Sequence, residues 1–235
     1  MRPRAPLHGR ARAAYNRGDN SHERVTSLQV LLINGSPHAR GCTYTALAEV
    51  AGALHAEGIR THLLHVGTRP ISGCMGCGGC AGTHRCVFAD DPVNEAIALA
   101  GQCDGFVFGS PVHYAAASGA ITAFMDRMFY AGSAVMRGKP AAAVVSARRA
   151  GTTAAIDQLN KYFMISGMPI AASQYWPMVH GSTPEQVMQD EEGLQTMRQL
   201  GRCLAWMIRS FAIAREHGVL PPAPEAERKR TNFIR

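Results

Sequence analysis

The sequence contains no long apolar run, and this absence excludes several kinds of protein. No window reaches the ~18 consecutive apolar residues that a membrane-spanning helix needs. The longest late run, Leu204 to Ala214, is interrupted by Arg209. The N-terminal stretch MRPRAPLHGRARAAYNRGDN is basic but has no apolar segment behind it, so it does not match a secretory signal. We therefore expect no contact with a membrane and no export.

The cysteines do not form the spaced pattern of a disulfide framework. Four of the seven lie between Cys74 and Cys86, within thirteen residues. Such crowding is typical of a metal or cofactor site in a reducing compartment, and so of a cytoplasmic protein.

Positive charge is scarce on the central part of the chain, although the net charge is +7. Residues 1–26 hold six arginines against one aspartate and one glutamate, and residues 221–235 hold four basic and two acidic residues. A nucleic-acid-binding protein would carry a basic stripe with exposed aromatics on its folded body. The charge pattern therefore argues against nucleic acid and favours basic ends that are solvated or clasp another subunit.

The hydrophobic pattern predicts five strands that alternate with helices. We expect near-continuously apolar strands at 28–33, 59–66, 104–109, 139–146 and 169–176. Helices are expected from about 43 to 58, after Asp90-Asp91-Pro92, after Ser118-Gly119, up to about 166, briefly after Thr183-Pro184, and from about 190 to 217. This alternation predicts a doubly wound parallel sheet at 27–217, preceded by a basic extension at 1–26 and followed by a tail at 218–235.

Three of the predicted strands end in polar loops, which would meet at the carboxyl edge of the sheet. The first, NGSPHARGCTY from Asn34, runs into a helix N-terminus, an arrangement that suits a phosphate. It lacks both G-K-[ST] and G-x-G-x-x-G, which indicates a single phosphate monoester, although an ordinary capped turn remains the alternative. The second loop is SPVHY from Ser110, and the third is ARRAGTT from Ala147. A phosphate pocket beside a polar, aromatic-edged slot fits flavin mononucleotide (FMN).

These motifs resemble the flavodoxin-like NADPH-dependent FMN reductases. The resemblance extends from Leu28 to about Phe211 and rests on GSPHARGCT, the Asp90-Asp91 pair, DGFVFGSPVHY and ITAFMDR. It implies a five-stranded sheet of order 2-1-3-4-5 and FMN-phosphate contacts at Ser36, His38, Arg40, Cys42, Thr43 and Tyr44. It also implies a flavin ring flanked by Pro111, Val112, His113, Tyr114, Ser146, Arg148, Arg149, Gly151 and Thr152. His38 and Cys42 depart from the usual family pattern, and a core position is the alternative for Tyr114.

The cysteine motif leaves three interpretations open. Cys74-x2-Cys77-x2-Cys80-x5-Cys86 in a glycine-rich loop can wrap an iron–sulfur cluster. It resembles the compact motif of the iron-sulfur flavoproteins, a branch of the same family, which implies a [4Fe-4S] cluster. Free or redox-active thiols are the second interpretation, and a zinc site is the third. Of the isolated cysteines, Cys103 and Cys203 are expected in the core.

The resemblance implies an FMN-dependent oxidoreductase that passes hydride from NAD(P)H through FMN to a small-molecule or protein acceptor. The alternative function is single-electron transfer between a ferredoxin-like donor and FMN through the cluster. Since the cofactor supplies the chemistry, we single out no protein group as a catalytic acid or base, and His113, Arg148 and Arg149 are the polar groups best placed to contact the flavin edge or a substrate. Asp126-Arg127 is expected to form a helix-end or intersubunit ion pair. A homodimer or homotetramer is also expected.

Overall fold

The computed structural model describes residues 28–225, 227, 229 and 231. The expected extension at 1–26 and the end of the tail lie outside these residues. Within them, a parallel sheet has the order β2-β1-β3-β5-β6, and the short β4 pairs with β3. This is the expected order 2-1-3-4-5, with the hairpin strand β4 added.

The strands alternate with helices along the chain, as the hydrophobic pattern predicted. The strands are β1 (Gln29–Asn34), β2 (Arg60–His65), β3 (Gly105–His113), β4 (Ala116–Ala117), β5 (Ala141–Ala147) and β6 (Met178–His180). The helices are α2 (Cys42–Ala56), α3 (Val93–Ala100), α4 (Gly119–Met136), α5 (Thr152–Ile165), α6 (Pro184–Val187) and α7 (Glu191–Glu216). Among the residues that the structure describes, no helix is long and apolar enough to cross a membrane.

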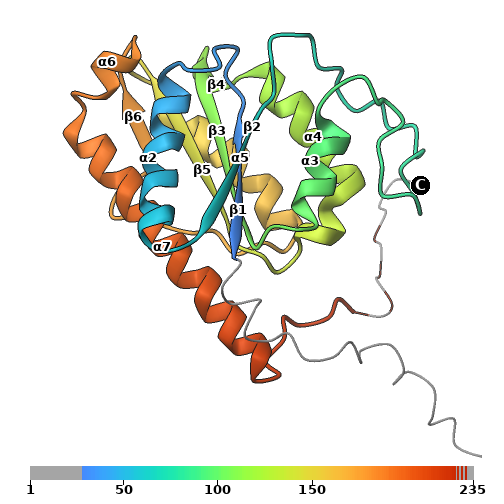
Figure 1. The fold of residues 1–235 in the computed structure, drawn as a ribbon. Helices are drawn as coiled ribbons and strands as arrows, with labels where there is room; N and C mark the ends of the chain where they lie inside the picture. The colour runs from blue at the N-terminus through green and yellow to red at the C-terminus, as the bar shows by residue number, and fades with distance from the viewer. Residues whose placement is uncertain (1–27, 226, 228, 230, 232–235) are drawn as a thin grey trace, which may run out of the picture.

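Helices cover both faces of the sheet (Figure 1). Successive residues of a strand point to opposite faces, so Leu31 and Phe108 pack under α3, α4 and α5, whereas Leu32 and Val107 pack under α2 and α7. Burial on both faces explains why β1 and β3 read as continuous apolar runs.

The fifth predicted strand is misplaced. At 169–176 the structure has only one bridge, between Ala141 and Ile170, and the strand that pairs with β5 is β6. Beyond the bridge, the Ser173 hydroxyl donates to the Thr196 carbonyl at 2.7 Å on α7. The rings of Tyr175 and Trp176 contact each other edge-on at 4.8 Å and remain about half exposed. After the bridge at Ile170 the segment is therefore outside the sheet, and Ser173 bonds to α7 instead.

Candidate functional site

The first loop is shaped from within by Asn34, a buried residue at the end of β1. Its Oδ1 accepts from the Ser36 amide at 3.1 Å, and its Nδ2 donates to the Ala39 carbonyl at 3.2 Å. The Ser36 hydroxyl accepts from the His38 amide at 3.1 Å. These local turns bury Ser36 and leave His38 and Arg40 exposed. No role was predicted for Asn34, although asparagine before glycine at a strand end is a turn signal.

The loop delivers free backbone donors at the start of α2. Its cap residue is Gly41, which makes no side-chain cap. The amides of Cys42, Thr43 and Tyr44 donate to none of the described residues. Three unpaired N–H groups at the positive end of a 15-residue helix have the geometry that can bind an anion. The Cys42 thiol points elsewhere, donating to the Gly181 carbonyl at 3.7 Å, and burial raises its pKa.

The second loop is a β-hairpin with a strained tip. Val112 pairs with Ala117 and His113 with Ala116, so the turn consists of Tyr114 and Ala115 alone. Both have positive φ, 49° and 61°, as a two-residue type I′ turn requires. Neither residue type favours this conformation, and strained residues of this kind cluster at active sites and ligand-binding loops. The Tyr114 ring is fully exposed, so the alternative of a core aromatic is wrong.

The third loop meets both of the others. The Ser146 hydroxyl, at the end of β5, lies 2.8 Å from the Thr43 hydroxyl of α2, and both are buried. A Cβ on Gly151 would approach the Ala115 Cα to 2.5 Å, so this glycine lies directly under the hairpin tip. Gly151 has φ 92° and begins α5, with Thr152 buried behind it. Arg148 and Arg149 are exposed on this loop.

Two serines complete the connection between the loops. The Ser118 hydroxyl, at the cap of α4, donates to the Gly35 carbonyl of the first loop at 3.0 Å. The Ser118 amide donates to the Ser110 hydroxyl at 3.0 Å. The three predicted loops thus form one connected rim at the carboxyl edge of the sheet. Apart from the helix cap, no sequence signal indicated this serine relay.

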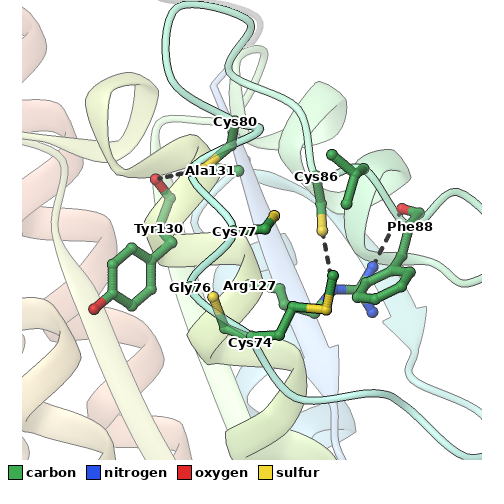
Figure 2. Close-up of a pocket in the computed structure, with 12 residues that line it drawn as sticks. Cys74, Gly76, Cys77, Cys80, Cys86, Phe88, Arg127, Tyr130 and Ala131 are labelled. Carbon is green, nitrogen blue, oxygen red and sulfur yellow. Dashed lines mark hydrogen bonds between the residues drawn. The ribbon is translucent and has the colours of Figure 1, made fainter.

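The four clustered cysteines lie on the long segment between β2 and α3. Figure 1 shows this segment passing outside α3 and α4, and Figure 2 shows its cysteines around one hollow beside α4. Cys74, Cys77, Cys80 and Cys86 all line the hollow. Cys74 and Cys77 are exposed, whereas Cys80 and Cys86 are half-buried. Gly76 and Gly78 have φ near 64° and 70°, left-handed turns that let the chain curl between the thiols.

Arg127 of α4 forms the floor of this hollow and is only 1% exposed. Its guanidinium pairs with Asp91, and its Nε donates to the Cys86 sulfur at 3.1 Å. Burial alone would lower the pKa of this guanidinium, but the hydrogen bonds to Asp91 and Cys86 raise it overall. The expected helix-end or intersubunit pair is therefore wrong. Asp126 instead accepts from the Tyr162 hydroxyl at 2.5 Å, and Arg127 turns inward to its own buried carboxylate.

No three histidine, cysteine, aspartate or glutamate side chains, among the residues that the structure describes, are close enough to hold one metal ion. Zn²⁺ would need its thiolates at ~2.3 Å from a single centre. In a four-iron cluster each thiolate binds a different iron, so the sulfurs stand farther apart around a larger centre. The thiols, the glycine turns and the shared hollow fit such a cluster better than one ion. Of the remaining cysteines, Cys103 is buried as expected, but Cys203 is only half-buried.

The chain resembles known flavoproteins over most of its length. An iron-sulfur flavoprotein of Methanocaldococcus jannaschii is 30% identical over 191 residues, which are 77% of this chain and 98% of that protein. One from Archaeoglobus fulgidus is 29% identical over 190 residues, which are 76% of this chain and 96% of its own.

Solved structures show the same fold at low identity. RosB with bound 8-demethyl-8-formylriboflavin-5'-phosphate has a TM-score of 0.63 at 13% identity, covering 88% of this chain and 92% of its own. A flavodoxin, WrbA-like protein from Agrobacterium tumefaciens has a TM-score of 0.54 at 15% identity, covering 78% of this chain and 98% of its own. The profile of the NADPH-dependent FMN reductases matches residues 28–183, and the chain belongs to this family of FMN-dependent oxidoreductases.

Proposed function

We propose that the protein binds FMN at the carboxyl edge of its sheet and uses it to pass electrons from NAD(P)H to a small-molecule or protein acceptor. One observation supports this most directly: the open N-terminus of α2 and the strained hairpin lie on one connected rim. The amides of Cys42 to Tyr44 would hold the phosphate, and exposed Arg40 and His38 would add contacts. The buried hydroxyls of Ser36 and Thr43 instead hold the loop in shape.

The flavin ring would lie against the second and third loops. Tyr114 offers an exposed aromatic face, and Gly151 permits close approach of the backbone. Arg148, Arg149 and His113 are exposed at the same rim, where they can contact the flavin edge or the nicotinamide nucleotide. Bound FMN supplies hydride acceptance and storage of two electrons, while these residues bind and orient it.

A reductive half-reaction tests this proposal. FMN-loaded protein, purified without oxygen, is mixed with NADPH or NADH while the flavin absorbance is followed. We expect bleaching without any partner protein, and slower bleaching in Arg149→Ala because this substitution removes a positive charge from the rim where the nucleotide would bind. Arg198→Ala, which removes only an exposed ion pair to Glu49, is the matched control and should react like the parent. Protein that binds no flavin would contradict the proposal.

A second function is favoured by the four thiols that line one hollow and by the relatives named iron-sulfur flavoproteins. In this version Cys74, Cys77, Cys80 and Cys86 hold a [4Fe-4S] cluster, which exchanges single electrons with a ferredoxin-like donor. Iron and acid-labile sulfide should be present in protein purified without oxygen. Cys77→Ser should lose most of the iron, whereas Cys203→Ser, a cysteine on α7 outside the hollow, should retain it. Iron absent from the parent would leave free or redox-active thiols.

A further inference from the structure

We propose that Arg127 is the positioning residue of the cysteine hollow: its Nε–H donates to the Cys86 sulfur and continues to do so when Cys86 is a cluster ligand. The inference rests on the proposed cluster. The cysteine motif does not include Arg127, which lies 41 residues beyond Cys86 in the chain. Figure 2 shows it reaching from α4 toward the Cys86 sulfur.

Every nitrogen of the Arg127 guanidinium is engaged, so the group has one fixed orientation. Nη1 donates to Asp91 and, at 3.4 Å, to the Ser72 carbonyl. Nη2 donates to the Phe88 carbonyl and to the Asp91 Oδ1, both at 3.2 Å. The Phe88 ring lies 4.9 Å from the guanidinium carbon. The Nε–H therefore points at the Cys86 sulfur. Because the guanidinium is planar and both of its terminal nitrogens are hydrogen-bonded, it cannot rotate away from that sulfur.

The backbone of Cys86 is fixed independently. Asn94 accepts from the Cys86 amide at 2.9 Å and donates to the Cys86 carbonyl at 3.0 Å and to the Phe88 carbonyl at 2.9 Å. By contrast, the thiols of Cys74 and Cys77 are exposed and make no hydrogen bond with the described residues. The Cys80 thiol donates weakly to the Tyr130 carbonyl at 3.9 Å, so Cys86 is the cysteine of the hollow that is held both at its backbone and by a charged donor to its sulfur.

The hydrogen bond, more than the positive charge, distinguishes Cys86. Asp91 lies against the guanidinium and neutralises its charge at close range. A directional N–H donor to a ligand sulfur stabilises the more negative, reduced cluster, which raises its reduction potential. It also holds the thiolate in place and so slows loss of iron.

Three variants separate the hydrogen bond from the charge pair. In Arg127→Gln the side-chain amide nitrogen occupies the position of Nε and keeps a donor, whereas in Arg127→Met a methyl group occupies that position. Both are combined with Asp91→Asn so that no buried carboxylate is left unpaired. The amide oxygen introduced by Asp91→Asn can still accept from the Val93 amide, as the Asp91 carboxylate does at 3.1 Å. Arg127→Lys, with Asp91 intact, keeps the ion pair but places a methylene at the Nε position.

The measurements are the midpoint potential of the cluster, the rate of iron release to a chelator, and hydrogen exchange across residues 72–91. We expect a lower potential and at least ~10-fold faster iron release in the Met and Lys variants, with the Gln variant close to the parent. Exchange at 72–91 should rise most in the Met variant. Arg198→Met, which alters only an exposed ion pair, should match the parent in all three.

Two results would overturn the inference, and they are distinguishable. A parent that contains iron and sulfide, with equal potentials and release rates in the Gln, Met and Lys variants, would refute the role of Arg127 while leaving the cluster in place. A parent without iron or sulfide would refute the cluster itself, and the role of Arg127 toward it would fall with it. If both double variants fail to fold, Arg127→Lys alone decides, and an unchanged potential in it refutes the role.

Discussion

Replacing Gly151 with alanine should damage the flavin site through the hairpin that lies over it. The added Cβ would lie 2.5 Å from the Ala115 Cα, and ordinary contact begins at 3.4 Å, so one side must move by about 0.9 Å. The Ala115 Cα is a backbone atom, which cannot swing aside as a side-chain tip could. Alanine at φ 92° adds backbone strain of about 1–3 kcal/mol.

The shift displaces the turn that carries Tyr114. We expect the steric clash and the strain at positive φ together to lower the free energy of unfolding by roughly 2–4 kcal/mol. The affinity for FMN should fall about tenfold, because moving the ring and the loop amides by about 1 Å loses on the order of 1.4 kcal/mol of contact. Urea unfolding of the flavin-free protein measures the first quantity, and quenching of flavin fluorescence measures the second.

Gly119→Ala is the matched control. Gly119 begins α4 near the same rim, has no positive φ, and a Cβ there meets nothing within 4 Å. It should leave FMN affinity unchanged and stabilise α4 slightly. If Gly151→Ala bound FMN as tightly as Gly119→Ala, the placement of the flavin against the hairpin would be refuted.

Other residues give independent tests. Arg40→Ala should weaken FMN binding roughly tenfold at low ionic strength and by less as salt is added, because an exposed, charge-assisted contact between Arg40 and the phosphate is screened by salt. An equal effect at all salt concentrations would argue against a contact between Arg40 and the phosphate. Thr43→Val should cost about 1–3 kcal/mol of stability because it leaves the buried Ser146 hydroxyl without its partner, whereas Thr43→Ser should cost less. Burial raises the pKa of the Cys103 thiol to about 11 from 9.0, so the stability it contributes is present below pH 9 and is lost as pH rises toward 11. The loss should be on the order of 1–3 kcal/mol in urea unfolding, and Cys103→Ala should show a smaller decline over the same range.

Much of the fold followed from local chemistry. Apolar strands that alternate with helices predicted β1, β2, β3 and β5, and the helix starts expected at Ser118, Thr183 and about 190 are capped by Ser118, Thr183 and Asp190, whose side chains each accept from a first-turn amide. The prediction was wrong at 169–176, where apolar residues suggested a strand but the structure has a single bridge at Ile170 and a side-chain hydrogen bond from Ser173 to α7. Propensity reports what a segment favours alone, and tertiary partners can override it.

Residue types and spacing determined the fold class, the three loops at the strand ends and the four-cysteine loop. Each of these depends on interactions within a few residues. The sequence could not show that Thr43 lies against Ser146, that Gly151 lies under Ala115, or that Arg127 turns inward to Asp91 and Cys86. The members of each pair are far apart in the chain, so only the packing of α2, α4 and α5 on the sheet brings them together.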